Sequence, residues 1–493
     1  MKPDRVLAID QGTTGSTALV LDARGVVRGR GYAELPQHFP SPGWVEHDGE
    51  EIWRSVGVAV KVALRGARGP AHAIAAIGIT NQRETTLLWD RSSGKPHGRA
   101  IVWQDRRTTE DCAVLRRRGL EPEIRRRTGL RLDPYFSATK LAWMLRHGAA
   151  APARRGRLAF GTIDSWVLWK LTGGAVHATD PTNASRTLLY DIGRLRWDPR
   201  LLEMFGVPPT LLPEVRPSSG HFGVTRGVPG LPDGIPITGI AGDQQAALFG
   251  QGCVAPGQSK NTYGTGCFML LHTGRRRRPS RAGLLTTVAC GRRGEAAYAL
   301  EGSVFIAGAA IQWLRDGLGL LARAGDSEAL ARSVADSGGV VLVPAFVGLG
   351  APYWRPDVRG AVFGLTRGTT RAHLVRAALE SLAFQTRDVF EAMARDAGGR
   401  VRLLRVDGGA AANDFLMQYQ SDLLGVPVER PRVVETTALG AGLLAGLGVG
   451  LWSPRQLARA RRIDRVFRPR QGSRWRKAEV TRWKAAVATL LAR

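Results

Sequence analysis

The sequence has few cysteines and no long hydrophobic segment. Its four cysteines, Cys112, Cys253, Cys267 and Cys290, show no metal-binding or redox spacing, so we expect free thiols in a reducing cytoplasm. The first five residues are polar and do not form a signal peptide. The longest uncharged run, Thr436–Trp452, is rich in glycine and shorter than the roughly 20 apolar residues of a membrane span. The sequence therefore predicts a cytoplasmic protein with no membrane span, and a buried helix over that run.

Acidic residues are also few: 42 Asp and Glu stand against 70 Lys and Arg, which gives a net charge of +28. Such an excess can indicate a nucleic-acid partner. However, nearly all of it is arginine scattered along the chain, as in Arg116–Arg118 and Arg275–Arg278, and no helix-turn-helix, zinc-finger or aromatic RNA-binding motif is present. We therefore expect solvated surface charge and no nucleic-acid partner.

A chain of 493 residues with 44% hydrophobic residues is too long for one core, so we expect two large domains. Near the start, the apolar run Val6–Ile9 predicts a buried strand that ends at Asp10. A turn with Gly12, Thr13, Thr14 and Gly15 follows, and a second strand continues from it as a hairpin. Backbone and hydroxyl donors beside one carboxylate suit a nucleotide polyphosphate, with Asp10 near Mg²⁺. The alternative is an ordinary hairpin with a polar turn, and no Walker loop is present.

The same pattern returns about halfway along the chain. The segment Lys260–Leu271 predicts a second hairpin, with Gly264-Thr265-Gly266 at its turn. A strand over Leu403–Val406 leads to Gly408, Gly409 and Asn413, where a strand-to-helix turn favours phosphate. We also expect a helix over Gly302–Trp313, with Gly308 inside it. Two phosphate-suited hairpins indicate two similar domains that face each other across a cleft.

Polar residues follow other predicted strands. The strand Ile74–Ile79 leads to Arg83 and Glu84, which could grip a polyol because Arg donates and Glu accepts. A strand is expected over Ile101–Trp103. Another, from Ile235, ends in glycines and Asp243, and these glycines form a candidate hinge. In α/β proteins such strand ends bind ligands. Helices are expected over Glu50–Arg65 and His373–Ala394.

Many short motifs, in order, resemble the carbohydrate-kinase family that includes xylulokinase, gluconokinase and glycerol kinase. Within this family the resemblance to bacterial glycerol kinases is close. The two family signatures are Tyr135–Trp143 and the segment from Gly360 to Glu380. Further matching segments are Pro42–Asp48, Gly78–Thr86, Gly239–Gln251, Asn261–Met269 and Arg405–Gly409. The resemblance implies an α/β fold of two actin/hexokinase-like (ribonuclease H-like) ATPase domains that face each other across a cleft. We place the N-terminal domain at residues 1–241 and the C-terminal domain at residues 242–493.

The resemblance also implies an activity, the ATP-dependent phosphorylation of glycerol to sn-glycerol 3-phosphate with ATP/ADP and Mg²⁺, and a role for each site residue. Asp243 would be the catalytic base. Glycerol would contact Arg83, Glu84, Trp103, Tyr135, Asp243, Gln244 and Phe268. The nucleotide would contact Thr13, Thr14, Gly15, Thr265, Gly308, Gln312, Gly409 and Asn413, and Mg²⁺ would lie near Asp10 and Asp243.

Two departures from the family pattern affect function. Many glycerol kinases carry Ser and Arg where this chain has Gly15 and Thr17, so a hydroxyl and a cation are missing from the phosphate turn. Some bacterial members are inhibited by fructose 1,6-bisphosphate through an Arg that corresponds to Gly234 here, beside the acidic Asp233. The nearest cation, Arg226, lies at the other end of that loop, so we expect little or no such inhibition.

Two other functions remain possible from the residues alone. One is a kinase of the same family that acts on another polyol or sugar, such as erythritol, xylulose or gluconate. The other is a nucleotide-binding protein that has lost its activity, against which Asp10, Asp243 and Thr265 argue. The resemblance further implies a homo-oligomer, either a dimer or a tetramer.

Overall fold

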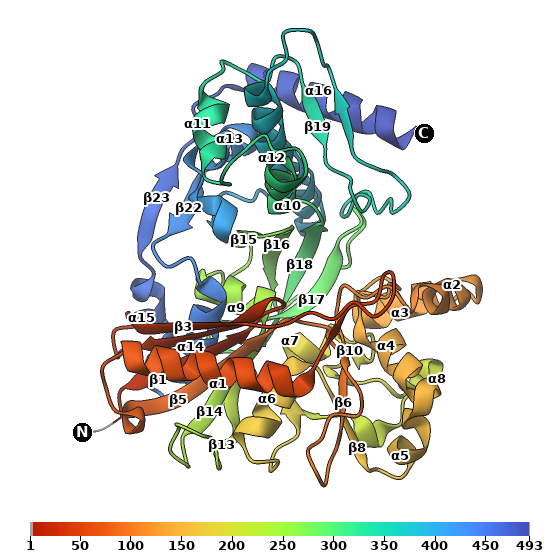
Figure 1. Cartoon of the computed structure of the whole chain (residues 1–493), viewed down its shortest axis with the longest axis vertical. Helices are drawn as coiled ribbons and strands as arrows, with labels where there is room; N and C mark the ends of the chain where they lie inside the picture. Colours follow the sequence, from red (N-terminus) through yellow and green to blue (C-terminus); the bar gives the residue numbers. More distant parts are fainter. Residues whose placement is uncertain (1–2, 493) are drawn as a thin grey trace.

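The structure is a computed structural model that describes residues 3–492; Met1 and Lys2, part of the polar start of the chain, lie outside the described residues. Two mixed sheets organise the chain, and the N-terminal sheet with helix α1 lies at the bottom of Figure 1. In spatial order its six strands are β13 (Ser219–Val224), β14 (Pro236–Gly242), β5 (Ile74–Asn81), β1 (Arg5–Gln11), β2 (Gly15–Leu21) and β3 (Val27–Glu34).

The C-terminal sheet has seven strands. In spatial order these are β17 (Leu285–Cys290), β18 (Ala296–Val304), β16 (Cys267–Gly274), β15 (Ser259–Tyr263), β21 (Leu404–Asp407), β22 (Val428–Pro431) and β23 (Ile463–Phe467). Five two-stranded pairs complete the strands: β4 (Glu46–His47) with β7 (Ala100–Ile101), β6 (Leu87–Asp90) with β8 (Leu158–Gly161), β9 (Ala178–Thr179) with β12 (Glu214–Val215), β10 (Tyr190–Asp191) with β11 (Arg196–Trp197), and β19 (Val341–Val343) with β20 (Ala361–Phe363).

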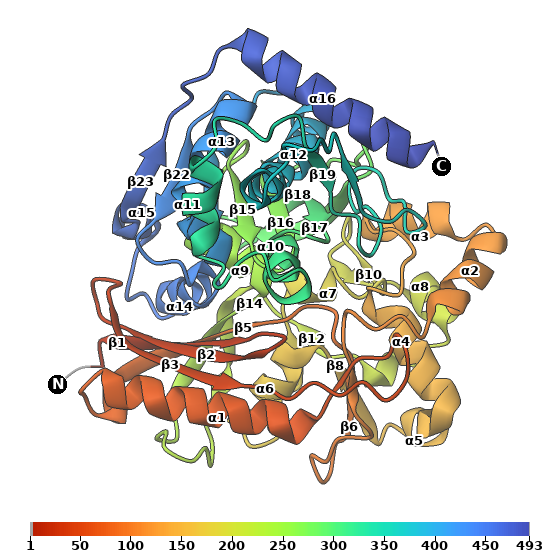
Figure 2. The same ribbon diagram turned by 45° about the horizontal axis from the view of Figure 1, so that its top comes forward.

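The helices cover the sheets and build a third packed region. They are α1 (Gly49–Gly66), α2 (Thr109–Arg117), α3 (Glu121–Thr128), α4 (Ser137–Met144), α5 (Ala150–Arg154), α6 (Ile163–Leu171), α7 (Pro181–Ala184), α8 (Pro199–Phe205), α9 (Asp243–Gly250), α10 (Gly308–Gln312), α11 (Asp326–Arg332), α12 (Arg371–Ala397), α13 (Asp414–Leu424), α14 (Thr436–Gly448), α15 (Pro454–Ala460) and α16 (Ser473–Leu491). Figure 2 shows α16 across the top of the C-terminal half and α1 along the bottom of the N-terminal half. Within the described residues, no helix is both long enough and apolar enough to cross a membrane.

Both predicted hairpins are confirmed. Strands β1 and β2 pair antiparallel, with Asp10 opposite Thr17, and strands β15 and β16 do the same, with Tyr263 opposite Cys267. In each half the first hairpin strand also pairs in parallel with a later strand, β5 or β21. Each turn therefore lies at the same sheet edge as the end of a parallel strand, which is where α/β proteins place their ligands.

The helices predicted from periodicity are confirmed as α1 and α12, and the uncharged run forms the buried helix α14. Helix α1 begins where the Asp48 carboxylate accepts hydrogen bonds from the Glu50 and Glu51 amides, a normal N-cap. Helix α14 lies in the C-terminal half of the sequence, between β22 and β23, but packs against β1, β5 and β14 of the N-terminal sheet. Glycines on both elements permit this contact: a Cβ on Gly78 of β5 would overlap the Ala441 carbonyl, and a Cβ on Gly442 of α14 would overlap the Leu21 side chain.

Two sequence predictions of local structure are wrong. Residues 302–304 continue strand β18, and the helix begins only at Gly308, because this stretch pairs with β16 in the sheet. The expected strand over Ile101–Trp103 is only the two-residue β7, which ends at Ile101. Trp103 is thereby free of a strand ladder and bonds through its ring to the first hairpin turn.

Candidate active site

The first hairpin turn is closed by its own backbone. The Gly12 amide donates to the Gly15 carbonyl at 2.9 Å, and the Trp103 ring nitrogen donates to the Thr13 hydroxyl at 2.9 Å. Thr14, at the tip of the turn, is exposed. The side chain of Trp103 therefore fixes Thr13, while Thr14 presents its donors outward.

The glycine at position 15, where the family pattern predicts Ser, has a structural explanation. A Cβ at this position would lie 2.5 Å from the Ala33 carbonyl oxygen and 2.6 Å from the Tyr32 hydroxyl. Tyr32 lies on β3 directly opposite Thr17, and its hydroxyl is 3.4 Å from the Thr14 carbonyl oxygen. The phenol thus occupies the space of the missing side chain and brings a hydroxyl to the same turn.

The second hairpin turn is docked onto the start of α10. The Ala307 amide donates to the Thr265 carbonyl at 2.8 Å, and the Gly308 amide donates to the Gly264 carbonyl at 3.0 Å. A Cβ on Gly308 would lie 2.6 Å from that same Gly264 oxygen, so only glycine permits the contact. Thr265 remains exposed. The structure therefore brings together Thr265 and Gly308, two of the residues that the resemblance assigns to the nucleotide.

Three other nucleotide candidates lie on neighbouring elements. Gly409 opens a short 3₁₀ turn after β21, next to β15, and it is exposed. Asn413 is half-buried and already used, because its side chain accepts from the Leu416 amide at 2.9 Å to cap α13 and donates to Ser327 at 3.3 Å. Gln312 ends α10 with an exposed side chain.

Arg83 and Glu84 are buried beyond the end of β5 with side-chain exposures of 2% and 1%. The Arg83 guanidinium meets three carboxylates: Asp243 Oδ1 is 3.0 Å from its Nε, Glu301 Oε2 is 2.6 Å from NH1, and Glu84 Oε1 is 3.7 Å from Nε. Glu84 in turn accepts from Arg186 Nε at 2.6 Å. Burial raises the pKa of the Glu84 carboxyl, although Arg83 and Arg186 oppose that rise.

Asp243 is the first residue of α9 and has 29% side-chain exposure. The neighbouring Gln244 is buried, and its side-chain oxygen accepts from the ammonium of Lys260 at 2.5 Å. Burial lowers the pKa of that lysine below its usual range. An accessible carboxylate with fixed neighbours is suited to accept a proton from a bound hydroxyl group.

An aromatic wall lies beside these polar groups. Trp103 packs edge-on against Tyr135, with ring centroids 5.6 Å apart, and against Phe268 at 6.4 Å. All three rings are half-buried, and the Tyr135 hydroxyl is 3.5 Å from Arg83 NH2. Trp103 and Tyr135 come from the N-terminal half and Phe268 from the C-terminal half. The wall offers carbon surface next to hydrogen-bonding groups, which a polyol requires.

One acidic candidate for the metal site acts on the other. Burial, together with the charge of Asp243, raises the pKa of Asp10 to about 8. Like charges that disfavour each other's ionisation are relieved when a cation binds between them. Among the described residues no cluster of three or more His, Cys, Asp or Glu could hold a metal by itself. Mg²⁺ is commonly held by one or two carboxylates, waters and substrate phosphates.

Sequence reasoning missed Arg186 and Glu301, both fully buried at the centre of the site. Arg186 follows the short helix α7, where no periodicity or motif marks it. Glu301 carried one signal, since it is a lone carboxylate inside the apolar strand β18. A charged residue in such a position needs a partner, and that need could have identified it.

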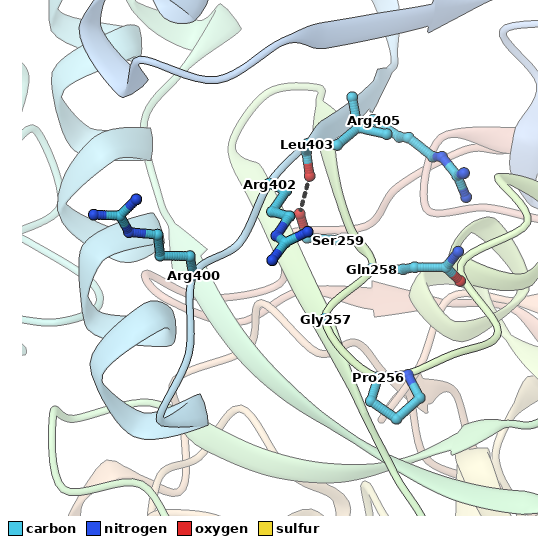
Figure 3. A pocket seen from close by; sticks show the side chains of 8 residues that line it. All are labelled: Pro256, Gly257, Gln258, Ser259, Arg400, Arg402, Leu403 and Arg405. Atoms are coloured by element: carbon cyan, nitrogen blue, oxygen red, sulfur yellow. Dashed lines mark hydrogen bonds between the residues drawn. The ribbon is translucent and has the colours of Figure 1, made fainter.

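The cavity in Figure 3 lies elsewhere. It has a volume of about 270 Å³ and contains none of the predicted site residues; its lining is Pro256, Gly257, Gln258, Ser259, Arg400, Arg402, Leu403 and Arg405. The three guanidinium groups do not converge in Figure 3. That of Arg405 donates to the Gln251 carbonyl at 2.9 Å. We therefore do not assign an anion site to this cavity.

A phosphate-suited turn in each half, beside a buried site of hydroxyl-binding groups, defines a two-domain phosphotransferase that acts on a polyhydroxylated substrate. The chain belongs to the FGGY family of carbohydrate kinases: the family's N-terminal domain matches residues 5–250 and its C-terminal domain matches residues 259–449. The predicted fold class, two actin/hexokinase-like ATPase domains, is confirmed.

The relatives of this chain include glycerol kinases that match it over nearly its whole length. The glycerol kinase of Aromatoleum aromaticum is 59% identical over 485 residues (98% of both chains), and that of Xanthomonas axonopodis pv. citri is 56% identical over 490 residues (99% of this chain and 98% of the relative). The crystal structure of Plasmodium falciparum glycerol kinase with ADP is 36% identical, with a TM-score of 0.92 and 99% of each chain covered. A xylulose kinase from Lactobacillus acidophilus, 21% identical with a TM-score of 0.86 over 99% of this chain and 98% of that one, shares the fold.

Proposed function

We propose that the chain transfers the γ-phosphoryl group of ATP to glycerol and forms sn-glycerol 3-phosphate. The observation that carries this proposal is the position of Arg83, whose Nε lies 3.0 Å from the accessible Asp243 carboxylate while its other edge is held by Glu301. A guanidinium that can donate to a hydroxyl group and a carboxylate that can act as a base thus lie together beside the aromatic wall. The relatives named glycerol kinase, 55–59% identical over nearly the whole chain, support the same substrate.

Glycerol would lie between the polar groups and the rings. Arg83 and Gln244 would donate to its hydroxyl oxygens, Glu84 would accept from a hydroxyl group, and Tyr135 could do either. Trp103 and Phe268 would pack against its carbon atoms. A site with buried, paired polar groups discriminates strongly against analogues that lack a hydroxyl, because its own groups are then left unsatisfied.

Asp243 would act as the general base. As the primary hydroxyl oxygen attacks the γ-phosphorus, its proton passes to the Asp243 carboxylate, a new P–O bond forms, and the bond between the γ-phosphorus and the bridging oxygen breaks so that ADP leaves. General-base help of this kind contributes about 10²–10⁴-fold in rate. The larger contribution is positioning and the stabilisation of charge on the transferred group.

The two hairpin turns would hold the nucleotide. Its contacts would be Thr13, Thr14, Gly15, Thr265, Gly308, Gln312, Gly409 and Asn413. Asp10 and Asp243 would hold Mg²⁺, which supplies positive charge to the phosphate oxygens when bound. Because Asn413 already caps α13, we assign it the weakest direct contact of this set.

Three further properties belong to the proposal. The four cysteines are free and buried, in agreement with a reducing cytoplasm. We retain a homo-oligomer, a dimer or a tetramer, from the family resemblance. We also retain the division at residues 241 and 242, with α14 as an element of the second half that packs on the first sheet.

A coupled ADP-release assay with glycerol, erythritol, xylulose and gluconate tests the proposal. We expect glycerol to give the highest kcat/KM, and an sn-glycerol-3-phosphate dehydrogenase to oxidise the product. Preference for another polyol would identify a different kinase of the same family. Binding of ATP without turnover of any polyol would identify an inactive nucleotide-binding protein.

A further inference from the structure

The carboxylate of Glu301 is the centre of a buried ionic network. It lies on β18 in the C-terminal half, whereas its partners Arg83 and Arg186 lie in the N-terminal half. Its two oxygens accept from Arg83 in a forked arrangement, at 2.6 Å for Oε2 and 3.1 Å for Oε1, and Oε1 also accepts from Arg186 NH2 at 2.9 Å. All three side chains are at most 2% exposed. A bidentate pair of this kind fixes the plane of the guanidinium as well as its distance.

Charge keeps this carboxylate ionised. Burial alone would favour the neutral acid, but Arg186 and Arg83 outweigh it and lower the pKa of Glu301 to about 2. Four of the charges in this network are buried, two positive (Arg83 and Arg186) and two negative (Glu84 and Glu301), and the partly exposed Asp243 adds a third carboxylate on Arg83. Removal of Glu301 would leave the two buried guanidinium groups with one buried carboxylate between them, which is costly in a dry site.

Glu84 depends on the same network. Its backbone φ is +63°, a left-handed conformation that is unusual for a residue other than glycine. Such a conformation persists where the surroundings fix it. The Ser137 hydroxyl donates to the Glu84 carbonyl at 3.0 Å, and Arg186 holds its carboxylate at 2.6 Å. Arg186 is therefore the link between Glu84 and Glu301.

We propose that Glu301 is a positioning residue through which the C-terminal half completes the polyol site: it aligns Arg83 directly and Glu84 through Arg186. The inference rests on the proposed function, since Arg83 and Glu84 are the groups that would bind the polyol hydroxyls. Polyol affinity then depends on how the two halves are positioned relative to each other, because Arg83 and Glu84 lie in the N-terminal half and Glu301 lies in the C-terminal half. The nucleotide turns make no contact with this network in the hydrogen bonds of the described residues.

Glu301→Gln tests the proposal with the least change of shape. Its amide nitrogen would face a guanidinium donor, so the fork on Arg83 cannot form. Because loss of one partner of a buried charge pair is severe, we expect kcat/KM for glycerol to fall at least about 30-fold. The KM for ATP should change less than about threefold, as expected for an independent site. Glu301→Asp keeps the charge but is too short to reach both arginines, so its loss should be intermediate.

Substrate discrimination is the measurement that a merely structural role of Glu301 would leave unchanged. The wild type should strongly prefer glycerol over 1,3-propanediol, which lacks the middle hydroxyl group, and Glu301→Gln should reduce that preference. The matched control is Asp388→Asn in the same half. Asp388 is also buried, and it accepts from Trp483 at 2.6 Å and Tyr353 at 2.7 Å, outside the network. This control should lose stability without any change in the preference.

Several outcomes would overturn the inference. These are a folded Glu301→Gln variant with wild-type kcat/KM for glycerol, equal losses for glycerol and ATP, or the same change of preference in Asp388→Asn. If Glu301→Gln does not fold, Glu301→Asp and Arg186→Lys provide the same comparison, and a wild-type preference in both would contradict the inference. If the wild type prefers another polyol, the proposed substrate is wrong, whereas a selective loss for that polyol in the Glu301 variants still supports the positioning role.

Discussion

Asp243→Asn separates the chemical step from binding. The substitution keeps the shape of the side chain but removes the base, so we expect kcat to fall by about 10²–10⁴-fold. At about 1.4 kcal/mol for each factor of ten, this is a loss of roughly 3–6 kcal/mol of transition-state stabilisation. The structure limits the other effects. Arg83 loses its partner at Nε, but both of its bonds to Glu301 remain, so it stays in place for the substrate.

Stability should fall only moderately in the same variant. Asp243 is 29% exposed but its partner Arg83 is 2% exposed, so we expect a loss of about 1–3 kcal/mol, limited by the two bonds from Arg83 to Glu301 that remain. The charge of Asp243 also helps to raise the pKa of Asp10, so the variant should lower that pKa. The matched control is Glu121→Gln, which removes a carboxylate 3.0 Å from Arg116 and 22% exposed, outside the candidate site.

The assay is steady-state ADP release with saturating glycerol and ATP, with calorimetric titration of glycerol as the measure of binding. We expect Asp243→Asn to bind glycerol within about tenfold of the wild type while kcat collapses, and Glu121→Gln to match the wild type in both. Wild-type turnover in Asp243→Asn at neutral pH would refute the base assignment. A parallel loss of glycerol binding and kcat would instead show that Asp243 acts through the position of Arg83.

Four other perturbations test separate parts of the structure. Glu84→Ala should lower kcat/KM for glycerol at least about 10²-fold and leave the KM for ATP near its wild-type value, because it removes a buried acceptor; equal loss for both substrates would indicate a folding role. Gly15→Ser should lower stability by about 1–3 kcal/mol, measured by urea unfolding, because its Cβ overlaps the Ala33 carbonyl and the Tyr32 hydroxyl; an unchanged midpoint would contradict this. Burial lowers the pKa of Lys140 from 10.5 to about 7, so between these values the unfolded chain binds the extra proton and stability should rise with pH; Lys140→Met should abolish that rise in urea midpoints. Fructose 1,6-bisphosphate should leave initial rates unchanged, and saturable inhibition that Arg226→Ala abolishes would contradict the prediction.

The bisphosphate prediction gains a structural reason. In the loop before β14, the Asp233 carboxylate accepts from the Gly227 amide at 2.7 Å and so closes the loop on itself. Gly234 has a φ of +89° and no side chain to offer, and Arg226 is at the other end of the loop. A bisphosphate needs convergent positive charge, and here a negative charge is fixed between the two positions.

The sequence was informative where short-range pattern decides the structure. The apolar spacing of Ile52, Val56 and Val60 predicts helix α1 because those residues share one face. The two hairpins follow from apolar runs interrupted by Gly and Thr. The pattern fails at residues 302–304, where the sequence predicts a helix although sheet pairing with β16 keeps the chain extended. Pairing of this kind is a long-range contact that local preference does not contain.

The same distinction applies to the site. Arg83, Glu84 and Asp243 could be selected because each follows a predicted strand, and the ends of parallel strands meet at one sheet edge. Arg186 lies 102 residues from Glu84, and Glu301 lies 218 residues from Arg83, on the sheet of the other half. Neither has a local reason to lie there. Their presence follows instead from a requirement of the predicted residues: two adjacent buried charges, one of them on a left-handed backbone, need counter-charges from outside their own segment. Arg83 and Glu84, which the sequence indicates, therefore need partners whose positions the sequence does not give. The fold of the C-terminal half supplies Glu301, which contacts Arg83 directly and reaches Glu84 through Arg186.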